Sequence, residues 1–458
     1  MKVMIAILFS LIILMNSFAF GQNTLENHKL EAGVGIVDIS GKGAIIIDPL
    51  HVKAIVFRQG AVQVALVACD VIGVRRSTTY PARKKAALKT GIPFSNITVA
   101  ATHTHMASEH TDLESAVVKA IEKAQANLRP VTLTSALGQQ FDVSYNRRYF
   151  MKDGSVVFNP MFLNPDIVRP AGPIDPDVGV VLLNDSEDGT PLMSIVNFAL
   201  HLDTVKEYGA VYQEEGVGSP NAVSADYPYW IEEFLREDNG DEFNSIFFMG
   251  TAGNINHWDF SRPGPQSGHK TTTRMIGDSL AVAIRRALPE GTLEAPALAT
   301  RSRTLQIPLQ HITEEDVIWA QQLDDMELSG RSEEPDEREQ FLNSVRQRRI
   351  LWLNDQKQKG NDTLPIDVQV FRLSDNTAVV ALAGEIFVEH GLTLKNFSPF
   401  ENTIIITLAN DTIAYVPNKK AFAQGGYEVE NSRLAPGGGE MMIEAALQML
   451  RELEVDAQ

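Results

Sequence analysis

Two histidines stand two residues apart at the end of an apolar run. The segment Asn96–His105 reads NITVAATHTH, so a strand-like stretch ends in His103 and His105. Residues two apart on a β-strand point to the same face, and both imidazoles are therefore expected to emerge together. Because open α/β sheets bind ligands at the carboxyl ends of their strands, this motif predicts a site at one sheet edge.

Two further apolar runs end in side chains that bind metals. Met193–His201 ends in a histidine, and Ala378–Glu385 ends in a carboxylate. Two histidines and a glutamate that converge at one edge can hold Zn²⁺ and leave a position for water or substrate. Such an ion lowers the pKa of its bound water to about 7 and polarises a carbonyl. A single strand-end histidine is more often a hydrogen-bonded structural residue, so the argument for His103, His201 and Glu385 is their recurrence on three strands.

The elements that must position these residues alternate between strand-like and helix-like runs, from Ala54–Phe57 to Gly439–Leu453. This alternation predicts an α/β fold with a mixed, largely parallel sheet flanked by helices. Residues from about 312 to 360 are densely charged and carry apolar residues at helical spacing, which predicts a helical insertion with a solvated face and no catalytic role. The loops Lys152–Asp177 and Val205–Ser224 are long, and such loops are more often functional than idle.

The first 21 residues have the pattern of a signal peptide. Lys2 precedes the apolar run Val3–Met15, and Asn16–Gly21 supplies a polar exit with small residues. The run is shorter than the roughly 20 residues of a membrane span, so removal on export is the better interpretation. No cysteine follows it, which argues against a lipid anchor. We therefore expect a secreted or periplasmic protein with one large domain over residues 22–458.

The composition excludes several classes of function. The chain has 458 residues and a formal charge of −18, from 58 acidic and 40 basic side chains. This balance argues against nucleic-acid binding, which needs clustered positive charge, and against strong attraction to anionic membranes. The single cysteine, Cys69, lies in an apolar run and is expected to be a buried thiol. No disulfide framework and no cysteine-based zinc finger is possible.

An ordered set of short motifs resembles the neutral/alkaline (non-lysosomal) ceramidase family, in its N-terminal catalytic domain. The matching pieces are Ala32–Ser40, Cys69-Asp70, Ala101–His105, Tyr145–Arg147, Asn197–His201, Ser224–Asp226, Gly250–Asn254, Gly384-Glu385, Ala409–Pro417 and Gly425–Glu428. Each piece is short, but together they run in order from about residue 32 to 440. The chain looks like a divergent member of this family.

The resemblance implies roles for individual residues. It implies four zinc ligands: His103, His201, Glu385 and Tyr415. His105 would lie beside the substrate and help to move protons, and Arg147 would stabilise a developing oxyanion. Tyr427 matches a tyrosine that hydrogen-bonds the scissile carbonyl. A packed aromatic in a glycine turn is the alternative for Tyr427.

Two departures from the family bear on the substrate. Asn256 stands where ceramidases carry a serine near the scissile amide, although its own amide could donate to an oxyanion. The chain ends at Gln458, which leaves too few residues for the immunoglobulin-like domain of the ceramidases and so weakens the case for a membrane lipid.

The sequence thus predicts a zinc-dependent hydrolase in which activated water attacks an amide or related carbonyl. One alternative is a zinc enzyme that acts on an extracellular carbohydrate or other polar polymer. Another is a non-catalytic binding protein of the same fold. The expected partner is a small molecule, or a lipid or glycan that contains an amide. We expect no nucleic acid and no stable membrane insertion, and the sequence leaves the oligomeric state open.

Overall fold

The computed structural model describes residues 29–107, 112–205, 221–264, 266–328 and 337–455. The expected signal peptide and most of the Val205–Ser224 loop lie outside these residues. Among the described residues, no helix combines the length and the apolar character needed to cross a bilayer.

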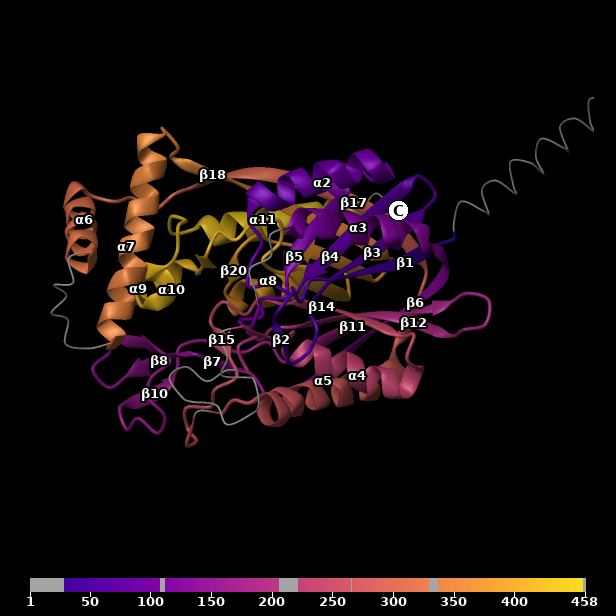
Figure 1. Ribbon diagram of the computed structural model, residues 1–458, viewed down its shortest axis with the longest axis horizontal. Helices are drawn as coiled ribbons and strands as arrows, with labels where there is room; N and C mark the ends of the chain where they lie inside the picture. Colours follow the sequence, from indigo (N-terminus) through magenta and orange to yellow (C-terminus); the bar gives the residue numbers. More distant parts are fainter. Residues whose placement is uncertain (1–28, 108–111, 206–220, 265, 329–336, 456–458) are drawn as a thin grey trace, which may run out of the picture.

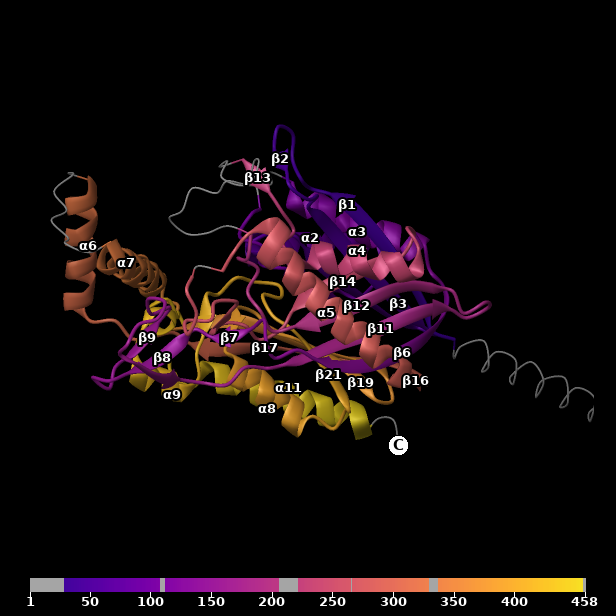
Figure 2. The same cartoon turned by 90° about the horizontal axis from the view of Figure 1, so that it is seen from below.

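Two β-sheets pack face to face and are covered by helices on their outer faces (Figures 1 and 2). The larger sheet has the order β14-β12-β11-β6-β1-β3-β4-β5, with β16 beside β6, and the smaller has the order β17-β18-β19-β21. The larger sheet comprises β1 (Glu31–Asp38), β3 (His51–Gln59), β4 (Val62–Cys69), β5 (Ile97–Ala101), β6 (Arg129–Gln139), β11 (Asp177–Asp185), β12 (Pro191–Phe198), β14 (Asn244–Met249) and β16 (Thr292–Glu294). The smaller comprises β17 (Pro296–Pro308), β18 (Thr363–Ser374), β19 (Thr377–Ala381) and β21 (Asn402–Ile406).

The helices form the two outer layers. Figure 2 shows α3 and α4 on one side of the strands and α8 and α11 on the other. The larger sheet is covered by α2 (Arg76–Thr90), α3 (Leu113–Ala126), α4 (Tyr227–Asn239) and α5 (Arg274–Ala287). The smaller sheet is covered by α8 (Val388–Phe397) and α11 (Gly438–Val455). The short helices α9 (Lys419–Gln424) and α10 (Tyr427–Glu430) lie between them in the chain.

Apolar side chains on both faces of the strands hold the four layers together. Along β3, Ile55 and Phe57 point into the core between the two sheets, whereas Ala54 and Val56 face the helices. Phe371 and Ile404 of the smaller sheet meet that inner core. A strand buried on both faces gains on the order of 25 cal/mol per Å² of apolar area removed from water, on each side.

The expectation of a mixed sheet flanked by helices is confirmed, but its largely parallel character is wrong. Parallel pairing is confined to β4·β5, β12·β14 and β19·β21, and the other pairs of the two sheets are antiparallel. Short turns make this possible, since only Gly60 and Ala61 separate β3 from β4. Because both faces of these strands are covered, their sequences lack the polar alternation of half-exposed antiparallel strands and look like parallel ones.

Short strand pairs lie near the carboxyl ends of the main strands. They are β2 (Ile45–Ile46) with β13 (Ala222–Val223), β7 (Tyr145–Asn146) with β15 (Ile255–Asn256), and β20 (Glu385–Ile386) with β22 (Tyr415–Val416). A separate three-stranded sheet contains β8 (Arg148–Met151), β9 (Val156–Phe158) and β10 (Ile167–Pro170). Two helices, α6 (Glu314–Leu328) and α7 (Glu337–Gln358), occupy the segment expected to be a helical insertion. In Figure 1 both project beyond the sheets, and α7 lies beside α9 and α10.

Candidate metal centre

Three histidines from two distant strands meet at one place. His103 and His105 follow β5, and His201 follows β12. One ring nitrogen from each lies within 4.8 Å of those from the other two. The backbone N–H of His105 donates to the carbonyl of Leu202 at 2.9 Å, which ties the two histidine-bearing loops together. The geometry therefore places His105 in one cluster with the two histidines that the sequence assigned to the metal, although its ring lies farther from His201 (6.0 Å) than that of His103 does (4.8 Å).

The backbone at His103 is held in an unusual conformation. Its φ of 76° lies in the left-handed region, which costs a non-glycine residue of order 1–3 kcal/mol. The N–H of His103 donates to Val71 O at 3.0 Å, and the N–H of Thr102 donates to Cys69 O at 2.8 Å. These bonds fix the turn after β5, so that the first imidazole points toward His201.

Glu385, which follows β19 of the smaller sheet, completes the cluster. Gly384, with φ of 86°, turns the chain after β19, and Glu385 then pairs in parallel with Tyr415 in the short β20·β22 ladder. Glu385 Oε2 lies 3.2 Å from His201 Nε2 and 3.5 Å from His103 Nε2. The structure thus brings together the histidines and the carboxylate that the three strand ends supply, with Tyr415 in register beside the carboxylate.

Backbone hydrogen bonds at Nδ1 orient the rings of His103 and His201, so that Nε2 of each faces Glu385. His103 Nδ1 lies 2.6 Å from Ile72 O, and His201 Nδ1 lies 2.8 Å from Ala252 O. A carbonyl oxygen only accepts, so each Nδ1 carries a hydrogen and each Nε2 faces Glu385. Two imidazole nitrogens and one carboxylate oxygen, all usual metal ligands, therefore converge on one space. A carbonyl on the second nitrogen is also typical of histidines that bind metals.

Burial and the charges of neighbouring side chains set the protonation states of the clustered residues in the metal-free protein. Burial by itself would raise the pKa of Glu385, but His103 and His201 hold it well below its usual range. Burial lowers the pKa of His105 to about 3, and burial together with the charge of Arg147 lowers the pKa of His201. Burial also opposes protonation of His103, but the nearby charge of Glu385 outweighs it and raises the pKa of His103. Glu385 is therefore ionised, and His105 and His201 are neutral near pH 7, as ligands must be.

A buried arginine lies against the cluster. Arg147 Nη1 lies 3.5 Å from His201 Nε2, while its Nε donates to Glu428 Oε1 at 2.9 Å. The guanidinium carbon is 5.2 Å from the ring centroid of Tyr415 and 5.7 Å from that of Tyr427. Arg147 Nη2 is buried without a hydrogen-bond partner among the described residues. One fixed donor of Arg147 is therefore unused beside the histidines.

The two tyrosines that the sequence singled out lie next to each other. The ring centroids of Tyr415 and Tyr427 are 5.3 Å apart at 66°. Burial raises the pKa of both hydroxyls, that of Tyr415 well above its usual value. Arg148 holds the glycine turn before Tyr427 by donating to Gly425 O at 2.9 Å, and it also pairs with Glu428. Tyr427 is thus part of the same assembly as Arg147, and both hydroxyls are protonated donors in the protein alone.

Asn256 is engaged elsewhere. Its side-chain nitrogen donates to Asn159 Oδ1 at 2.9 Å, and its oxygen accepts from the N–H of Trp258 at 3.0 Å. The structure describes no hydrogen bond from this amide to the histidines. Asn256 therefore braces the loop around Asn159, and the geometry does not bring it into the cluster.

Sequence reasoning missed a second buried pair beside the histidines. Asp203 Oδ1 lies 3.2 Å from His257 Nδ1, and both side chains are largely buried. Burial alone would raise the pKa of Asp203, but His257 and the charges of His105 and His201 hold it well below its usual range. One signal was available, because Asp203 follows His201 by two residues, the spacing that singled out His103 and His105.

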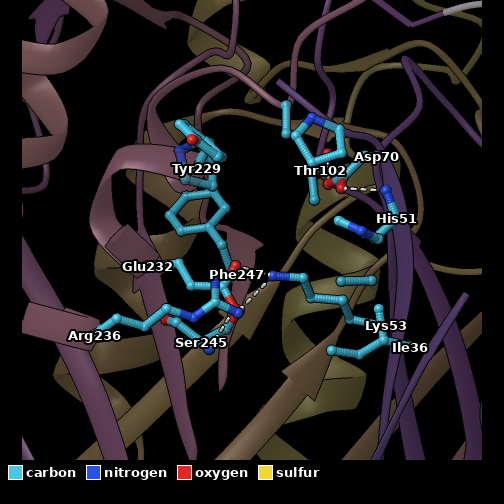
Figure 3. Close-up of a pocket in the computed structure, with 14 residues that line it drawn as sticks. Ile36, His51, Lys53, Asp70, Thr102, Tyr229, Glu232, Arg236, Ser245 and Phe247 are labelled. Atoms are coloured by element: carbon cyan, nitrogen blue, oxygen red, sulfur yellow. Dashed lines mark hydrogen bonds and ion pairs between the residues drawn. The ribbon is translucent and has the colours of Figure 1, made fainter. Parts of the chain in front are cut away.

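A separate polar pocket lies on the helix-covered side of the larger sheet (Figure 3). It is a cavity of about 110 Å³ between β3, β4, β14 and α4. Figure 3 shows Lys53 pointing toward Glu232 and Ser245, with which it forms an ion pair and a hydrogen bond, the latter to the carbonyl at 3.1 Å. Arg236 also pairs with Glu232 at 3.0 Å. The charges of this pocket are therefore matched within the protein.

Comparisons with known proteins show the fold. No protein-family model and no curated protein matches the sequence. The structure is similar to the crystal structure of neutral ceramidase from Pseudomonas aeruginosa, with a TM-score of 0.66 and 17% identity over 93% of this chain and 75% of that chain. It is also similar to a structure described as ceramidase complexed with C2, with a TM-score of 0.67, 17% identity and coverage of 93% and 76%. The chain thus has the neutral ceramidase fold, as its ordered motifs predicted.

Proposed function

We propose that the protein is a zinc-dependent hydrolase that cleaves an amide or related carbonyl compound. The observation that carries this proposal is the convergence of His103 Nε2 and His201 Nε2 on Glu385 Oε2, with each Nδ1 committed to a backbone carbonyl. The ceramidase fold adds that hydrolysis of an amide is a chemistry known on this scaffold.

The residues present fit a zinc ion. Imidazole nitrogen and carboxylate oxygen are usual zinc ligands, and catalytic sites keep a position open for water or substrate. We assign His103, His201, Glu385 and Tyr415 to the ion, with His105 adjacent. When bound, zinc supplies Lewis-acid chemistry that activates water and polarises a carbonyl.

The chain's own residues would then stabilise the charge that develops on the carbonyl oxygen. Arg147 is a fixed cation whose Nη2 is unused, and Glu428 holds its Nε in place. The Tyr427 hydroxyl is a second donor beside it. One such donor is worth about 10²- to 10³-fold in rate. We assign to His105 the transfer of a proton toward the leaving group, and we assign no oxyanion contact to Asn256 because its amide is already engaged.

A polar substrate is the second candidate, and Asp203 and His257 favour it. An ionised carboxylate whose charge acts on His105 can accept a hydrogen bond from a hydroxyl group of a substrate. An acylated glycan would offer both a carbonyl and such hydroxyls. We propose export from the cell on the sequence pattern of residues 1–21, under either candidate.

Metal content and a substrate panel test the proposal together. Elemental analysis of the purified protein should give about one zinc per chain, and His103→Ala should lose most of it. The panel should contain N-acyl lipids, short N-acyl amines and acetylated glycans, each assayed with and without a chelator. Absence of zinc from the wild type, or undiminished zinc in His103→Ala, would contradict the metal centre. Turnover that resists the chelator would contradict the mechanism.

A further inference from the structure

The helical insertion reaches the candidate site through one aromatic side chain. Phe341 of α7 stacks on Tyr427, with ring centroids 5.5 Å apart and planes at 29°. Phe158 at the end of β9 stacks on the same ring at 4.5 Å and 25°. Tyr427 in turn lies 5.3 Å from Tyr415, the tyrosine in register with Glu385. A continuous row of aromatic rings therefore runs from the cluster to the insertion.

Several polar contacts dock α7 against this row. Arg349 pairs with Glu430 of α10 at 3.1 Å, and Arg346 approaches the same carboxylate at 3.9 Å. Arg338 donates to the carbonyls of Phe158 and Asn159 at 2.5 and 3.1 Å. Figure 1 shows α7 lying beside α9 and α10. The contacts fix α7 on the segment that carries Tyr427 and on the one that carries Phe158.

Asn159 links this docking to the site itself. Its N–H donates to Arg147 O at 2.7 Å, and its side chain accepts from Asn256. The same residue accepts from Arg338 through its backbone carbonyl. The insertion is thus two hydrogen bonds from the main chain of Arg147. The sequence expectation of a solvated helical pair with no part in catalysis does not account for these contacts.

Phe341 keeps 44% of its surface exposed although it belongs to the row. A single exposed apolar side chain needs no explanation. Here, however, the exposed ring extends an aromatic surface that begins beside the residues assigned to the reacting carbonyl. A substituent of that carbonyl can lie against this surface, and burial of an apolar substituent contributes about 0.8 kcal/mol per CH₂ group.

We propose that Phe341, supplied by the helical insertion, is a specificity-determining residue that binds the apolar acyl portion of the substrate along the Phe158–Tyr427 stack. The proposal rests on the proposed function, since it places the acyl group relative to the reacting carbonyl. It predicts that Phe341 discriminates between substrates by acyl length and leaves the metal centre unchanged.

The test compares acetyl and dodecanoyl amides of one amine. Phe341→Ala should lower kcat/KM for the dodecanoyl amide roughly tenfold, and that for the acetyl amide by less than about twofold. Zinc content should not change. Phe341→Trp should restore most of the preference because it keeps an aromatic face. Phe397→Ala, which removes a 65% exposed phenylalanine from α8, is the matched control and should not change the ratio.

An equal loss for both substrates, or no loss for either, would overturn the proposal. If the wild type cleaves neither amide, the proposed function is judged by its own metal and substrate tests, and the role of Phe341 is tested by binding of dodecanamide measured by calorimetry. Binding that weakens roughly tenfold in Phe341→Ala would support the acyl-binding role of Phe341 without the reaction. Equal binding to both proteins, or no binding to the wild type, would exclude it.

Discussion

Two buried polar groups of this molecule differ in how their donors and acceptors are matched. In the pocket of Figure 3, the cations Lys53 and Arg236 both face Glu232, whose Oε1 also accepts from the N–H of Ser245 at 3.2 Å. At the candidate metal centre, Glu385 instead faces the imidazoles of His103 and His201, which are charged only when protonated. The first group is matched by lysine and arginine cations, whereas the second consists of side chains that can also bind a metal ion.

The identity of the neighbouring groups distinguishes a structural carboxylate from a candidate functional one better than burial does. Glu232 and Glu385 are 6% and 7% exposed, so exposure does not distinguish them. Removal of one partner from a matched buried ion pair leaves the other uncompensated and costs about 3–5 kcal/mol of stability. His103 and His201 hold the pKa of Glu385 well below its usual range, so the ionised carboxylate also stabilises the metal-free protein near pH 7. The two carboxylates should therefore differ in their effect on zinc binding, which only Glu385→Gln should weaken.

The largest expected effect is on activity at the candidate metal centre. Glu385→Gln should lower kcat by about 10³-fold or more, because the carboxylate that we propose as a metal ligand, and its charge, are lost. Added Zn²⁺ should raise the unfolding free energy of the wild type much more than that of the variant. Steady-state kinetics and urea unfolding with and without zinc check the two statements, and equal stabilisation of both proteins by zinc would remove the distinction between the two groups.

The next effect is on stability at the matched group. Glu232→Gln should lower the unfolding free energy by about 3–5 kcal/mol, because Lys53 and Arg236 lose their shared partner. The catalytic rate of the folded variant should stay close to that of the wild type. Glu233→Gln is the matched control: Glu233 also pairs with Arg236, but its side chain is 41% exposed and its loss should cost under about 1 kcal/mol. Urea titrations of the three proteins give the values, and equal losses for the two variants would refute the structural assignment.

A smaller effect is expected at the arginine beside the cluster. Arg147→Lys keeps a positive charge but loses the planar guanidinium. In the wild type, the Nε of this group donates to Glu428, and its Nη2 has no hydrogen-bond partner among the described residues. We expect kcat to fall about 10²-fold with little change in zinc content. Kinetics and elemental analysis of the same preparation measure both quantities. Loss of zinc in this variant would show that Arg147 organises the metal site instead of the reacting carbonyl.

The smallest expected effect is the pH dependence of the pocket. Burial, followed by the charge of Lys53, lowers the pKa of His51 from its usual 6.5 to about 4. The unfolded chain therefore binds more protons between pH 4 and 6.5, and this contribution to stability is lost as pH falls through that window. His51→Gln removes this pH dependence. The free energy of unfolding of the wild type minus that of the variant should therefore be about 1–3 kcal/mol greater at pH 7 than at pH 4. A difference that is the same at both pH values would contradict the assignment.

The sequence predicted the parts of the site that depend on local pattern. His103, His201 and Glu385 each end an apolar strand, so period-two spacing and strand ends were enough to group them. Tyr415 lies in a two-residue strand without any periodic signal, and only the resemblance to ceramidases indicated it. Asp203 and His257 meet through loops, and no spacing along the chain brings them together.

The errors have a physical origin as well. Strands buried on both faces lose the polar alternation that marks antiparallel pairing, which produced the expectation of a largely parallel sheet. The role that we propose for α7 is a separate matter, because it depends on Arg338 and Arg349 meeting partners more than eighty residues away, at Asn159 and Glu430. Its charged sequence resembles that of an ordinary solvated helix, and Phe341 stands out only once those partners are placed.

The central claim is that the cluster of His103, His201 and Glu385 binds a metal cation. The most direct measurement is the melting temperature of the metal-free protein during titration with Zn²⁺, for the wild type, His201→Ala and Glu232→Gln. We expect zinc to raise the melting temperature of the wild type and of Glu232→Gln and to saturate near one equivalent, while His201→Ala responds little. Equal stabilisation of wild type and His201→Ala, or no stabilisation of the wild type, would contradict it.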